Sequence, residues 1–456
     1  MPSSASPATI REPARDIPVV HEADVCVLGG SCTGLFAAVR AARLGARVVI
    51  VEKDNCFGGI ATTAMVNVWH SLWDTEGKRQ IIAGLTEEVV DRLDRRGAVL
   101  RHERTNPSRG FTFNSEELKI ELDELAREAG LGICFHTQFV APLLSDGGRL
   151  VAVAVENKSG RGAIRAKLFI DATGDADLVA RLGGETYFAN HLQPATACAR
   201  LAGWNTLGDA AGRLGELIRE HGPAHGLPPT FAWGNFVPGS DVYMLAATRI
   251  HGINPADADQ LTHGEIEGRR QVRAIMDILR AAAPDARLSL EALPSRLGLR
   301  ESRHIRSPYQ LTGDDVLAGR AFDDAIALGS YRVDVHHQDK PGITLRYLDG
   351  TEEYHRPGFP CERGRWRPET PINPTFYQVP YRTLLPIGGP DNVIVAGRML
   401  DVDPIAHAAV RVMVNMNQTG EAAGVAAVLA LDTPGGFPAV STTALRSALS
   451  RGGSAL

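Results

Sequence analysis

Apolar residues change their spacing along the chain, and the first clear pattern covers residues 24–54. Residues 25–28 are continuously apolar, which is typical of a buried parallel strand. Apolar residues at helical spacing continue to Leu44, Gly45 ends the helix, and residues 47–51 form a second apolar run. The pattern predicts a strand–helix–strand unit of roughly thirty residues. We expect the rest of the chain to be arranged around it.

The same reasoning predicts most of the remaining regular structure. Helical spacing or caps predict helices over 81–96, 114–129, 256–283 and 408–431, and short apolar runs predict strands over 131–140, 149–156, 163–170 and 392–396. The strands before residue 170 predict a β-meander layered beside a parallel sheet. Residues 185–375 are irregular and rich in Pro, Gly, His, Trp and Tyr, and their length favours an inserted domain over a linker.

The turn of the first unit has the spacing of a phosphate-binding loop, Gly29-Gly30-Ser31-x-x-Gly34. Gly29 permits the tight turn, Gly34 lets the helix pack on the strand, and free N–H groups at the helix start face a pyrophosphate. Glu52 is placed to bind an adenosine ribose, which favours FAD or NAD over a 2′-phosphorylated dinucleotide. Ser31 replaces the usual middle glycine, so close approach of the phosphates is strained there.

Three later stretches place small residues after predicted strands or turns. Gly58-Gly59-Ile60-Ala61-Thr62 lets the backbone run beside a flat cofactor. Asp171-Ala172-Thr173-Gly174-Asp175 ends a strand near the same crevice, and an ordinary surface loop is the alternative for both stretches. Ala396-Gly397-Arg398 precedes a helix rich in small residues, whose early turns offer N–H groups to an electron-rich ring.

Candidate bases come from three separate stretches. Histidine titrates near physiological pH, so His70, His336 and His407 are candidates to remove a substrate proton. The aromatic segment 64–73 around His70 is equally consistent with a pocket wall and with an ordinary core patch.

Charged residues concentrate at 297–305 and 331–337. Arg300 with Glu301 are candidates to orient a polar or anionic substrate. Ion pairing on a solvated strand is the alternative for these two segments.

Composition narrows the class of protein. A chain of 456 residues buries a substantial core and predicts two or three domains. A net charge of -5 argues against a general nucleic-acid binder, and six scattered cysteines predict a reducing cytoplasmic location. No apolar run is long enough for a membrane helix, and residues 1–20 lack the apolar core of a signal peptide, so we predict a disordered leader there. We predict no metal site.

The ordered set of motifs, completed by Arg300-Glu301-Ser302-Arg303 and Tyr377-Gln378-Val379-Pro380-Tyr381-Arg382, resembles the bacterial FAD-dependent oxidoreductases, which are glutathione-reductase-like flavoproteins, over roughly residues 23–431. The resemblance implies an α/β fold. A Rossmann-type FAD-binding domain with a parallel sheet and β-meander would be formed by 21–185 and 376–435. An α+β substrate or cap domain would occupy 186–375, followed by a C-terminal tail, 436–456.

The resemblance also implies FAD as cofactor and a role for each motif. By analogy, Gly29, Gly30, Ser31 and Gly34 hold the pyrophosphate, Glu52 the adenosine ribose, and Gly59, Ala61 and Thr62 pass the flavin; Val140, Ala172, Thr173 and Gly174 lie at the adenine side, and Gly397, Arg398, Arg411 and Val412 at the ribityl chain and pyrimidine edge. Thr33 and Lys53 complete the predicted cofactor-binding set.

Three functions stay open at this point. The first is a dehydrogenase or oxidase that transfers a hydride from a small polar substrate to flavin N5. The second is a redox-neutral elimination or hydrolysis on the same flavin, and the third is a non-redox dinucleotide-binding or tRNA-modifying flavoprotein. A second glycine motif and a C-x-x-x-x-C pair are absent, so oxygen, a quinone or a protein is the expected electron acceptor. Substrate and oligomeric state are not specified by the sequence.

Overall fold

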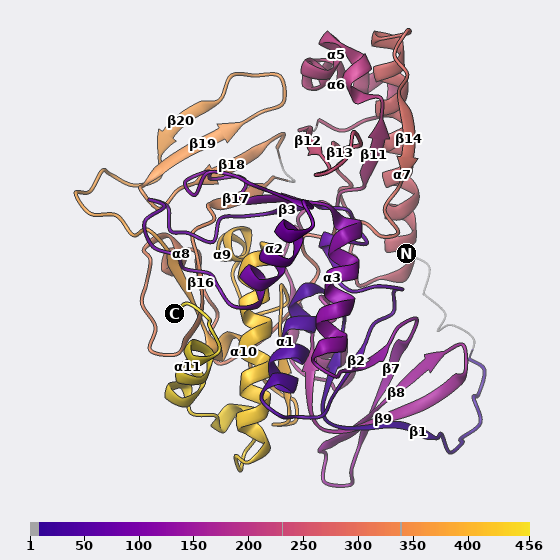
Figure 1. Cartoon of the computed structure of the whole chain (residues 1–456), viewed down its shortest axis with the longest axis vertical. Coiled ribbons are helices and arrows are strands. Elements are labelled where there is room, and N and C mark those ends of the chain that lie inside the picture. The colour runs from indigo at the N-terminus through magenta and orange to yellow at the C-terminus, as the bar shows by residue number, and fades with distance from the viewer. Residues whose placement is uncertain (1–8, 230, 338–339) are drawn as a thin grey trace, which may run out of the picture.

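The computed structural model describes residues 9–456, except residue 230 and residues 338–339. Residues 1–8 of the predicted leader lie outside the described residues, and Val19 already begins the first strand. Within this range the largest sheet has seven strands and lies at the lower right of Figure 1. Its strands are β1 (Val19–Leu28), β2 (Val48–Val51), β6 (Gly132–Cys134), β7 (Gln138–Leu144), β8 (Leu150–Asn157), β9 (Gly160–Asp171) and β22 (Val393–Val395).

The inner part of this sheet is parallel, as the apolar runs predict. β1 pairs in parallel with β2 and β9, β2 pairs with β6, and β22 pairs with β9. The end of β1 and all of β2 are buried, because helices cover the faces of a parallel sheet. The predicted α/β fold with a Rossmann-type strand–helix–strand unit is confirmed.

The β-meander belongs to the same sheet, so the prediction of a separate layer beside it is wrong. β7 and β8 pair antiparallel and continue the sheet from β9. β9 is twelve residues long, and its two halves have different partners on one edge. Residues 160–165 pair with β8, whereas residues 169–171 pair with β22. One long strand therefore joins the meander to the C-terminal strand.

The helix α1 (Cys32–Arg43) packs directly on α10 (Met413–Leu431), and the two lie side by side in Figure 1. A Cβ on Gly420 would lie 2.0 Å from the carbonyl oxygen of Thr33, and one on Gly424 would lie 2.2 Å from that of Ala37. Glycine is required at both positions, because any side chain would overlap the facing backbone. Two segments almost four hundred residues apart in sequence are thereby brought into contact.

A buried ion pair lies at the same contact. Arg40 Nε donates to Glu421 Oε2 at 2.7 Å, and Glu421 Oε1 accepts the N–H of Leu85 at 3.1 Å. Leu85 begins α2 (Leu85–Arg95), so this carboxylate joins three helices. Burial raises the pKa of Glu421, and the Arg40 guanidinium opposes that shift. Removing one partner would leave an unpaired buried charge, which costs about 3–5 kcal/mol.

The helix predicted over 408–431 is two helices, α9 (Pro404–Val410) and α10. Val412 between them is extended, with φ −65° and ψ 145°, so the prediction of one continuous helix is wrong. The sequence carries no glycine or proline at the break. The adjacent Arg411 binds Asp334 at 3.2 Å, a tertiary contact that local propensity does not reveal.

The helices predicted over 81–96, 114–129 and 256–283 are α2, α3 (Ser115–Glu128) and α7 (Ala258–Ala282), and most of the other elements were not predicted. The other helices are α4 (Asp177–Arg181), α5 (Asp209–Gly212), α6 (Leu214–His221), α8 (Gly313–Leu317) and α11 (Thr442–Arg451). The smaller sheets contain β3 (Val68–Trp69), β4 (Val99–Arg101) and β5 (Phe111–Phe113); β10 (Thr186–Phe188) and β15 (Arg303–Ile305); β11 (Cys198–Ala202), β12 (Trp233–Phe236), β13 (Tyr243–Ala246) and β14 (Ser289–Ala292); β16 (Ala325–Gly329) and β21 (Tyr377–Pro380); and β17 (Val333–His336), β18 (Ile343–Arg346), β19 (Thr351–His355) and β20 (Glu362–Arg365).

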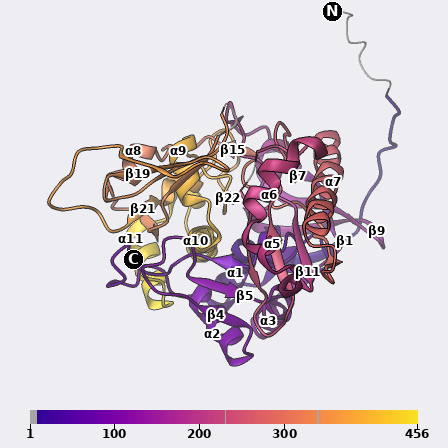
Figure 2. The same cartoon turned by 90° about the horizontal axis from the view of Figure 1, so that it is seen from above.

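The segment predicted as a substrate domain carries the pair of β10 and β15, the sheet of β11 to β14, the sheet of β17 to β20, and strand β16. The β18–β20 strands and the long helix α7 lie on opposite sides in both Figure 1 and Figure 2. β16, from the same segment, packs on α10, where Leu328 N–H donates to Gln418 Oε1 at 3.1 Å. The proposed boundaries at residues 186 and 375 stay predictions.

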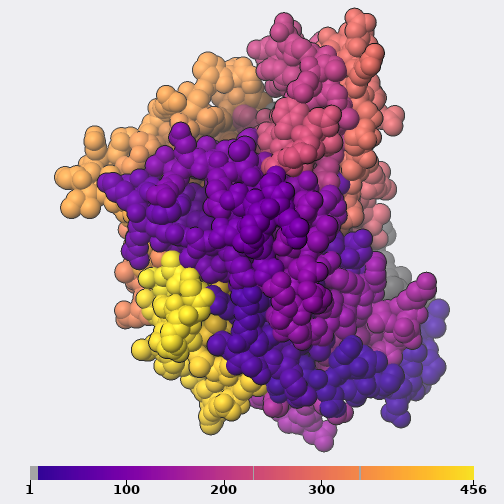
Figure 3. All heavy atoms as spheres, viewed as in Figure 1, coloured from indigo at the N-terminus to yellow at the C-terminus, as the bar shows by residue number. Residues whose placement is uncertain are grey.

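Atoms of the N-terminal third of the chain cover the middle of the face shown in Figure 3. None of the helices in the described ranges is long and apolar enough to cross a membrane.

We expect Gly424→Ala to destabilise the protein. The new Cβ would overlap the Ala37 carbonyl, and overpacking of this kind costs about 3 kcal/mol. Thermal unfolding of the purified protein should show a Tm lower by about 5 °C or more. The matched control is Gly215→Ala in α6, where a Cβ has no atom within 4 Å. Equal melting temperatures for the two variants would contradict the packing argument.

Candidate flavin and substrate cavity

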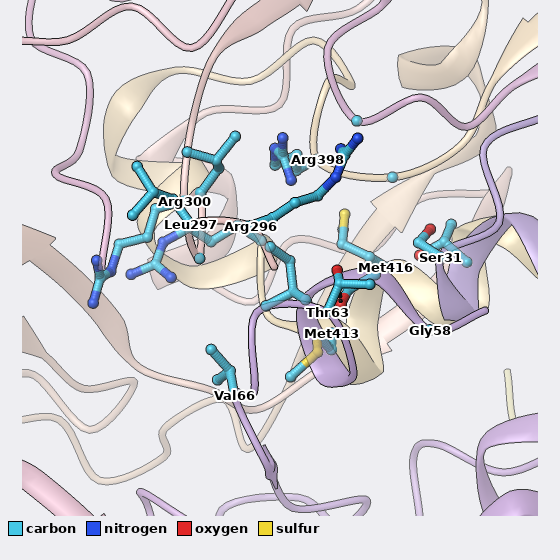
Figure 4. A pocket seen from close by; sticks show the side chains of 18 of the residues that line it. Ser31, Gly58, Thr63, Val66, Arg296, Leu297, Arg300, Arg398, Met413 and Met416 are labelled. Carbon is cyan, nitrogen blue, oxygen red and sulfur yellow. Dashed lines mark hydrogen bonds between the residues drawn. The ribbon is translucent and has the colours of Figure 1, made fainter. Parts of the chain in front are cut away.

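One cavity of about 960 Å³ extends from the glycine turn of the first unit to the charged residues of the irregular middle segment. Figure 4 shows Ser31 and Gly58 on one side of this cavity and Leu297 and Arg300 on the other. The walls come from both ends of the chain and from its middle. A cavity of this size and mixed lining is typical of a cofactor and substrate site.

The glycine turn is as closely packed as the motif predicts. A Cβ on Gly29 would lie 2.3 Å from the carbonyl oxygen of Ala172, and one on Gly34 would lie 1.9 Å from that of Gly29. Ser31 has an ordinary φ of −58°, so its backbone is unstrained. Its Oγ accepts the N–H of Gly34 at 3.4 Å and caps α1. The serine that departs from the usual motif therefore has a structural role, which the S-x-x pattern before a helix could have indicated.

Glu52 is fixed by two backbone N–H groups at the cavity wall. Its Oε2 accepts from Gly30 at 2.5 Å and its Oε1 accepts from Asp54 at 2.8 Å. Burial raises the pKa of Glu52, and these two N–H donors oppose the shift. Each carboxylate oxygen keeps a further lone pair for a hydroxyl donor. Lys53, the next residue, also lines the cavity.

The Gly58-Gly59 loop contributes only part of its predicted residues to the wall. Gly58 and Gly59 have φ angles of 107° and 54°, and both line the cavity. Ala61 and Thr62 are fully buried behind them and are not among the described lining residues. The Thr62 hydroxyl instead donates to the carbonyl of Phe57 at 2.7 Å and closes the loop.

The turn after β9 is held by its first carboxylate. Asp171 Oδ2 accepts the N–H groups of Leu178 and Val179 in α4, and its Oδ1 accepts the backbone N–H and the side-chain hydroxyl of Thr173. Burial raises the pKa of Asp171 to about 6. This network presents Ala172, Thr173 and Gly174 to the cavity, as the motif predicts.

Arg398, Arg411 and Val412 also line the cavity together with Gly397. Arg398 Nη2 donates to Asp175 Oδ1 at 2.9 Å. Burial opposes ionisation of Asp175, but Arg398 and the Ser302 hydroxyl outweigh it and lower the pKa. α10 begins at Met413, which lines the cavity. The unpaired N–H groups of its first turn therefore lie at this wall.

Val140 is the one predicted adenine-side residue that is not among the described lining residues. It lies at a β-bulge in β7, and its carbonyl accepts from Arg181 Nη1 at 2.6 Å. Thr137, Gln138 and Phe139 line the wall instead.

The far end of the cavity brings three predicted catalytic residues together. His70, Arg300 and His336 line it, with Asp334 and Tyr331 between them. Asp334 Oδ2 lies 3.4 Å from His336 Nε2 and accepts the Tyr331 hydroxyl at 3.0 Å. The His70 and Tyr331 rings lie 4.1 Å apart between centroids.

Both histidines at this end are neutral at physiological pH. Burial lowers the pKa of His336 to about 3, against the opposing field of Asp334. Burial also lowers the pKa of His70 to about 3, with help from Arg332 and Arg411. A neutral imidazole has one nitrogen that accepts a proton.

Glu301 and His407 are placed elsewhere. Both are buried and neither is among the described lining residues. Glu301 Oε1 lies 3.3 Å from His304 Nε2 and 3.7 Å from His407 Nδ1, while its Oε2 accepts the Gln193 N–H. Both ring nitrogens of His407 are buried without a hydrogen-bond partner among the described residues. Any effect of Glu301 or His407 on a substrate would pass through the neighbouring Arg300 or through α9.

Comparison with known proteins identifies the family. Residues 24–449 match the family described as FAD dependent oxidoreductase. The chain belongs to this family. It is an FAD-dependent enzyme, and its cofactor is FAD.

Solved structures with a similar fold are distant from this FAD-dependent oxidoreductase. A p-nitrophenol 4-monooxygenase from Pseudomonas putida is 11% identical, with a TM-score of 0.45, and the match covers 94% of this chain and 84% of that one. A geranylgeranyl bacteriochlorophyll reductase-like protein from Thermoplasma acidophilum is 12% identical, with a TM-score of 0.45 and coverage of 94% and 83%. The myxobacterial chondrochloren halogenase is 12% identical, with a TM-score of 0.43 and coverage of 95% and 79%. Nothing about the reaction of this chain follows from likenesses of this level.

The sequence reasoning missed Arg249, which lies after β13 and lines the far end of the oxidoreductase cavity. It is a single arginine in an ordinary apolar segment, so no local pattern distinguishes it. Only the pairing of distant strands brings it to the cavity.

We expect Glu52→Gln to weaken FAD binding in this oxidoreductase by about tenfold. An amide has one acceptor oxygen, so its NH₂ group would oppose either the Gly30 or the Asp54 N–H. The FAD retained after gel filtration, measured by absorbance, checks the change. The control is Glu156→Gln, because the half-buried Glu156 pairs with Arg161 and is not among the described lining residues. Equal FAD retention in the two variants would contradict a role for Glu52.

Proposed function

We propose that FAD binds along this cavity in the direction that the motifs predict. The pyrophosphate would be held by the N-terminus of α1 at Gly29, Ser31 and Thr33, the adenosine ribose by Glu52, and the flavin by Gly59, Gly397 and the N-terminus of α10. The glycines support this fit. Because they have no side chains, a phosphate can reach the backbone N–H groups of the turn. The positive ends of two helix dipoles at the wall favour the negative charge of a dinucleotide.

The protein then acts as a dehydrogenase or oxidase on a small polar organic molecule. The observation that carries this proposal is the continuity of the cavity, which joins the glycine loops to the group of His70, Tyr331, Asp334 and His336. When bound, FAD supplies the redox chemistry, because oxidised flavin accepts a hydride at N5. The protein has to orient the substrate and remove one proton.

His336 is the proposed proton acceptor. The Asp334 carboxylate can only accept hydrogen bonds, and its Oδ2 lies 3.4 Å from His336 Nε2. The neutral imidazole therefore carries its proton on Nε2 and its lone pair on Nδ1. A substrate hydroxyl or amine proton would pass to Nδ1 as the adjacent C–H bond is broken. Asp334 then stabilises the imidazolium, as carboxylates paired with catalytic histidines do.

The electron acceptor is proposed to be oxygen, a quinone or a protein. All the smaller sheets in the described part of the chain are antiparallel, so none of them is a second Rossmann sheet for a nicotinamide cofactor. The same observation leaves a redox-neutral elimination or hydrolysis as the second candidate. Turnover without any acceptor under anaerobic conditions would favour that second candidate.

The test is anaerobic incubation of the FAD-loaded protein, at stoichiometric amounts, with a small-molecule extract of cells. We expect flavin absorbance near 450 nm, roughly where oxidised flavins absorb, to decrease. Mass spectrometry should then show a compound that has lost two hydrogen atoms. If a compound is consumed while the flavin stays oxidised at every time point, the proposed dehydrogenase function would be excluded.

We expect His336→Asn to slow flavin reduction by the identified substrate by about a hundredfold or more while FAD stays bound. His70→Asn tests the second histidine at this end in the same way. The matched control is His337→Asn, the next residue in sequence, which is absent from the described cavity lining. Unchanged reduction rates in both the His336 and His70 variants would remove this pair of candidate bases.

The pH dependence provides a separate check. A pKa lowered to about 3 keeps His336 neutral, so the rate of flavin reduction should stay constant between about pH 5 and pH 8. An ordinary histidine would be half protonated near pH 6.5, and the rate would fall below it. Stopped-flow reduction of the wild-type protein measures this profile. A decline centred near pH 6.5 would contradict a buried neutral base.

A further inference from the structure

Two guanidinium groups at the far end of the cavity have no carboxylate within ion-pair distance among the described residues, although the field of Asp334 reaches both. Among the ion pairs of the described residues, Arg411 pairs with Asp334 at 3.2 Å, but Arg249 and Arg300 have no such pair. Arg249 Nη1 donates to the carbonyl of Thr248 at 2.7 Å. Arg300 Nη1 donates to the Pro194 carbonyl and, at 2.8 Å, to the Thr196 hydroxyl. We call Arg249 and Arg300 the arginine pair.

Strand pairing places the two arginines beside the same short segment. Ala195 forms a β-bridge with Ile250, and Thr196 forms one with Gly298. Residues 195–196 therefore lie between the chain that carries Arg249 and the chain that carries Arg300. Both side chains reach the same cavity, and Arg300 extends from the wall opposite Ser31 in Figure 4.

The arginine pair is held in place by its surroundings. Gln271 in α7 binds the main chain of Arg249 on both sides, because its Oε1 accepts the Arg249 N–H at 2.9 Å and its Nε2 donates to the Arg249 carbonyl at 2.9 Å. Arg249 is 5% exposed. In both guanidinium groups, Nη1 is the nitrogen with an acceptor among the described residues, so most donors remain available.

The local charge is strongly unbalanced. Asp334, a carboxylate at this end, already serves Arg411, His336 and Tyr331. Glu265 lines the same cavity, but it already serves Arg269 and the Leu297 N–H. The histidines are neutral, and Arg332 adds another positive charge that Glu353 partly offsets. Burial lowers the pKa of Arg249 to about 10, and burial together with Arg249 and Arg411 lowers the pKa of Arg300 well below its usual value.

Unpaired buried cations cost several kcal/mol each unless a ligand supplies the opposite charge. The FAD pyrophosphate is not that ligand in the proposed orientation, because the glycine turn lies across the cavity from Arg300. Guanidinium groups bind carboxylates and phosphates through two parallel hydrogen bonds.

We infer that the substrate of this site is a small organic acid, whose carboxylate is held by Arg249 and Arg300 next to His336. This inference rests on the proposed function, since it names the class of molecule that the oxidoreductase would oxidise. The carboxylate itself does not react. The two arginines bind and orient it, so that a neighbouring C–H bond is presented to the cofactor.

The experiment measures binding rather than turnover, so that it fails separately from the proposed function. FAD-loaded protein is titrated with malonate and succinate, and the visible flavin spectrum and Tm are recorded. The neutral probes malonamide and succinamide have the same shape without the charge. We expect at least one dicarboxylate to perturb the flavin spectrum and raise Tm, and to bind at least tenfold more tightly than its diamide.

Variants locate the binding to the arginine pair. Arg249→Gln and Arg300→Gln should each weaken dicarboxylate binding by at least tenfold. Arg300→Lys should retain part of the affinity. The matched control is Arg269→Gln. Arg269 lines the same cavity but already pairs with Glu265 at 3.4 Å, so its loss should leave dicarboxylate affinity unchanged.

Several outcomes would overturn the inference. They are equal binding of acids and diamides, no binding of either acid by protein that retains FAD, and equal loss of affinity in Arg269→Gln and Arg300→Gln. Phosphate or sulfate binding as tightly as the carboxylates would indicate a general oxyanion site and would also overturn it. The comparison of acids with diamides uses only wild-type protein, so it decides the question even if a variant does not fold. Dicarboxylate binding without flavin reduction would support the inference and would not bear on the proposed oxidation, because neither probe has the hydroxyl or amine that His336 would deprotonate.

Discussion

The contact between α1 and α10 is the constraint on which the cavity depends. α1 carries the glycine turn at its N-terminus, and α10 opens its own N-terminus at the cavity wall. The two helices can approach this closely only because Gly420 and Gly424 lack side chains. The Arg40–Glu421 pair lies in the same interface and is buried from solvent. A glycine stripe far from the redox chemistry therefore sets the position of two helix termini that face it.

Around this contact, the cavity changes in chemical character along its length. The glycine end offers backbone N–H groups, and its charged side chains Glu52, Asp175 and Arg398 are already held by neighbouring groups, which suits a phosphate and a flat ring. The far end has the opposite character, with arginines, one shared carboxylate and neutral histidines. Hydrophobic strands of the parallel sheet support the first end. Antiparallel strands from the middle of the chain, including β13 and β17, carry residues of the second.

Sequence reasoning worked best where the structure depends on neighbours along the chain. The period of the apolar residues at 25–51 specifies two strands and a helix, and the Asn114 cap marks the start of α3 correctly. It failed where distant contacts decide. The break at Val412 follows from no residue near it, and the join of β8 and β22 on one edge of β9 depends on where the C-terminal strand returns.

The same division holds for the candidate site. Glycine motifs are recognisable in a sequence because few other residues permit positive φ or close approach. Gly29, Gly58 and Gly397 could therefore be predicted near the cofactor from sequence alone, and all three line the cavity. Side chains that act through charge carry no such signature. Arg249 becomes notable only beside Arg300, and Glu301 and His407 become core residues only when their surroundings are known.

The packing of α1 on α10 also bears on how the protein is made. A ribosome releases the N-terminal glycine turn long before it reaches Gly420 and Gly424, so the first strand–helix–strand unit has no closing helix while most of the chain is synthesised. Contacts of such long sequence separation form late and slowly. FAD therefore meets a complete binding cleft only after Gly420 and Gly424 have been synthesised, and until then the apolar face of α1 lacks the helix that covers it.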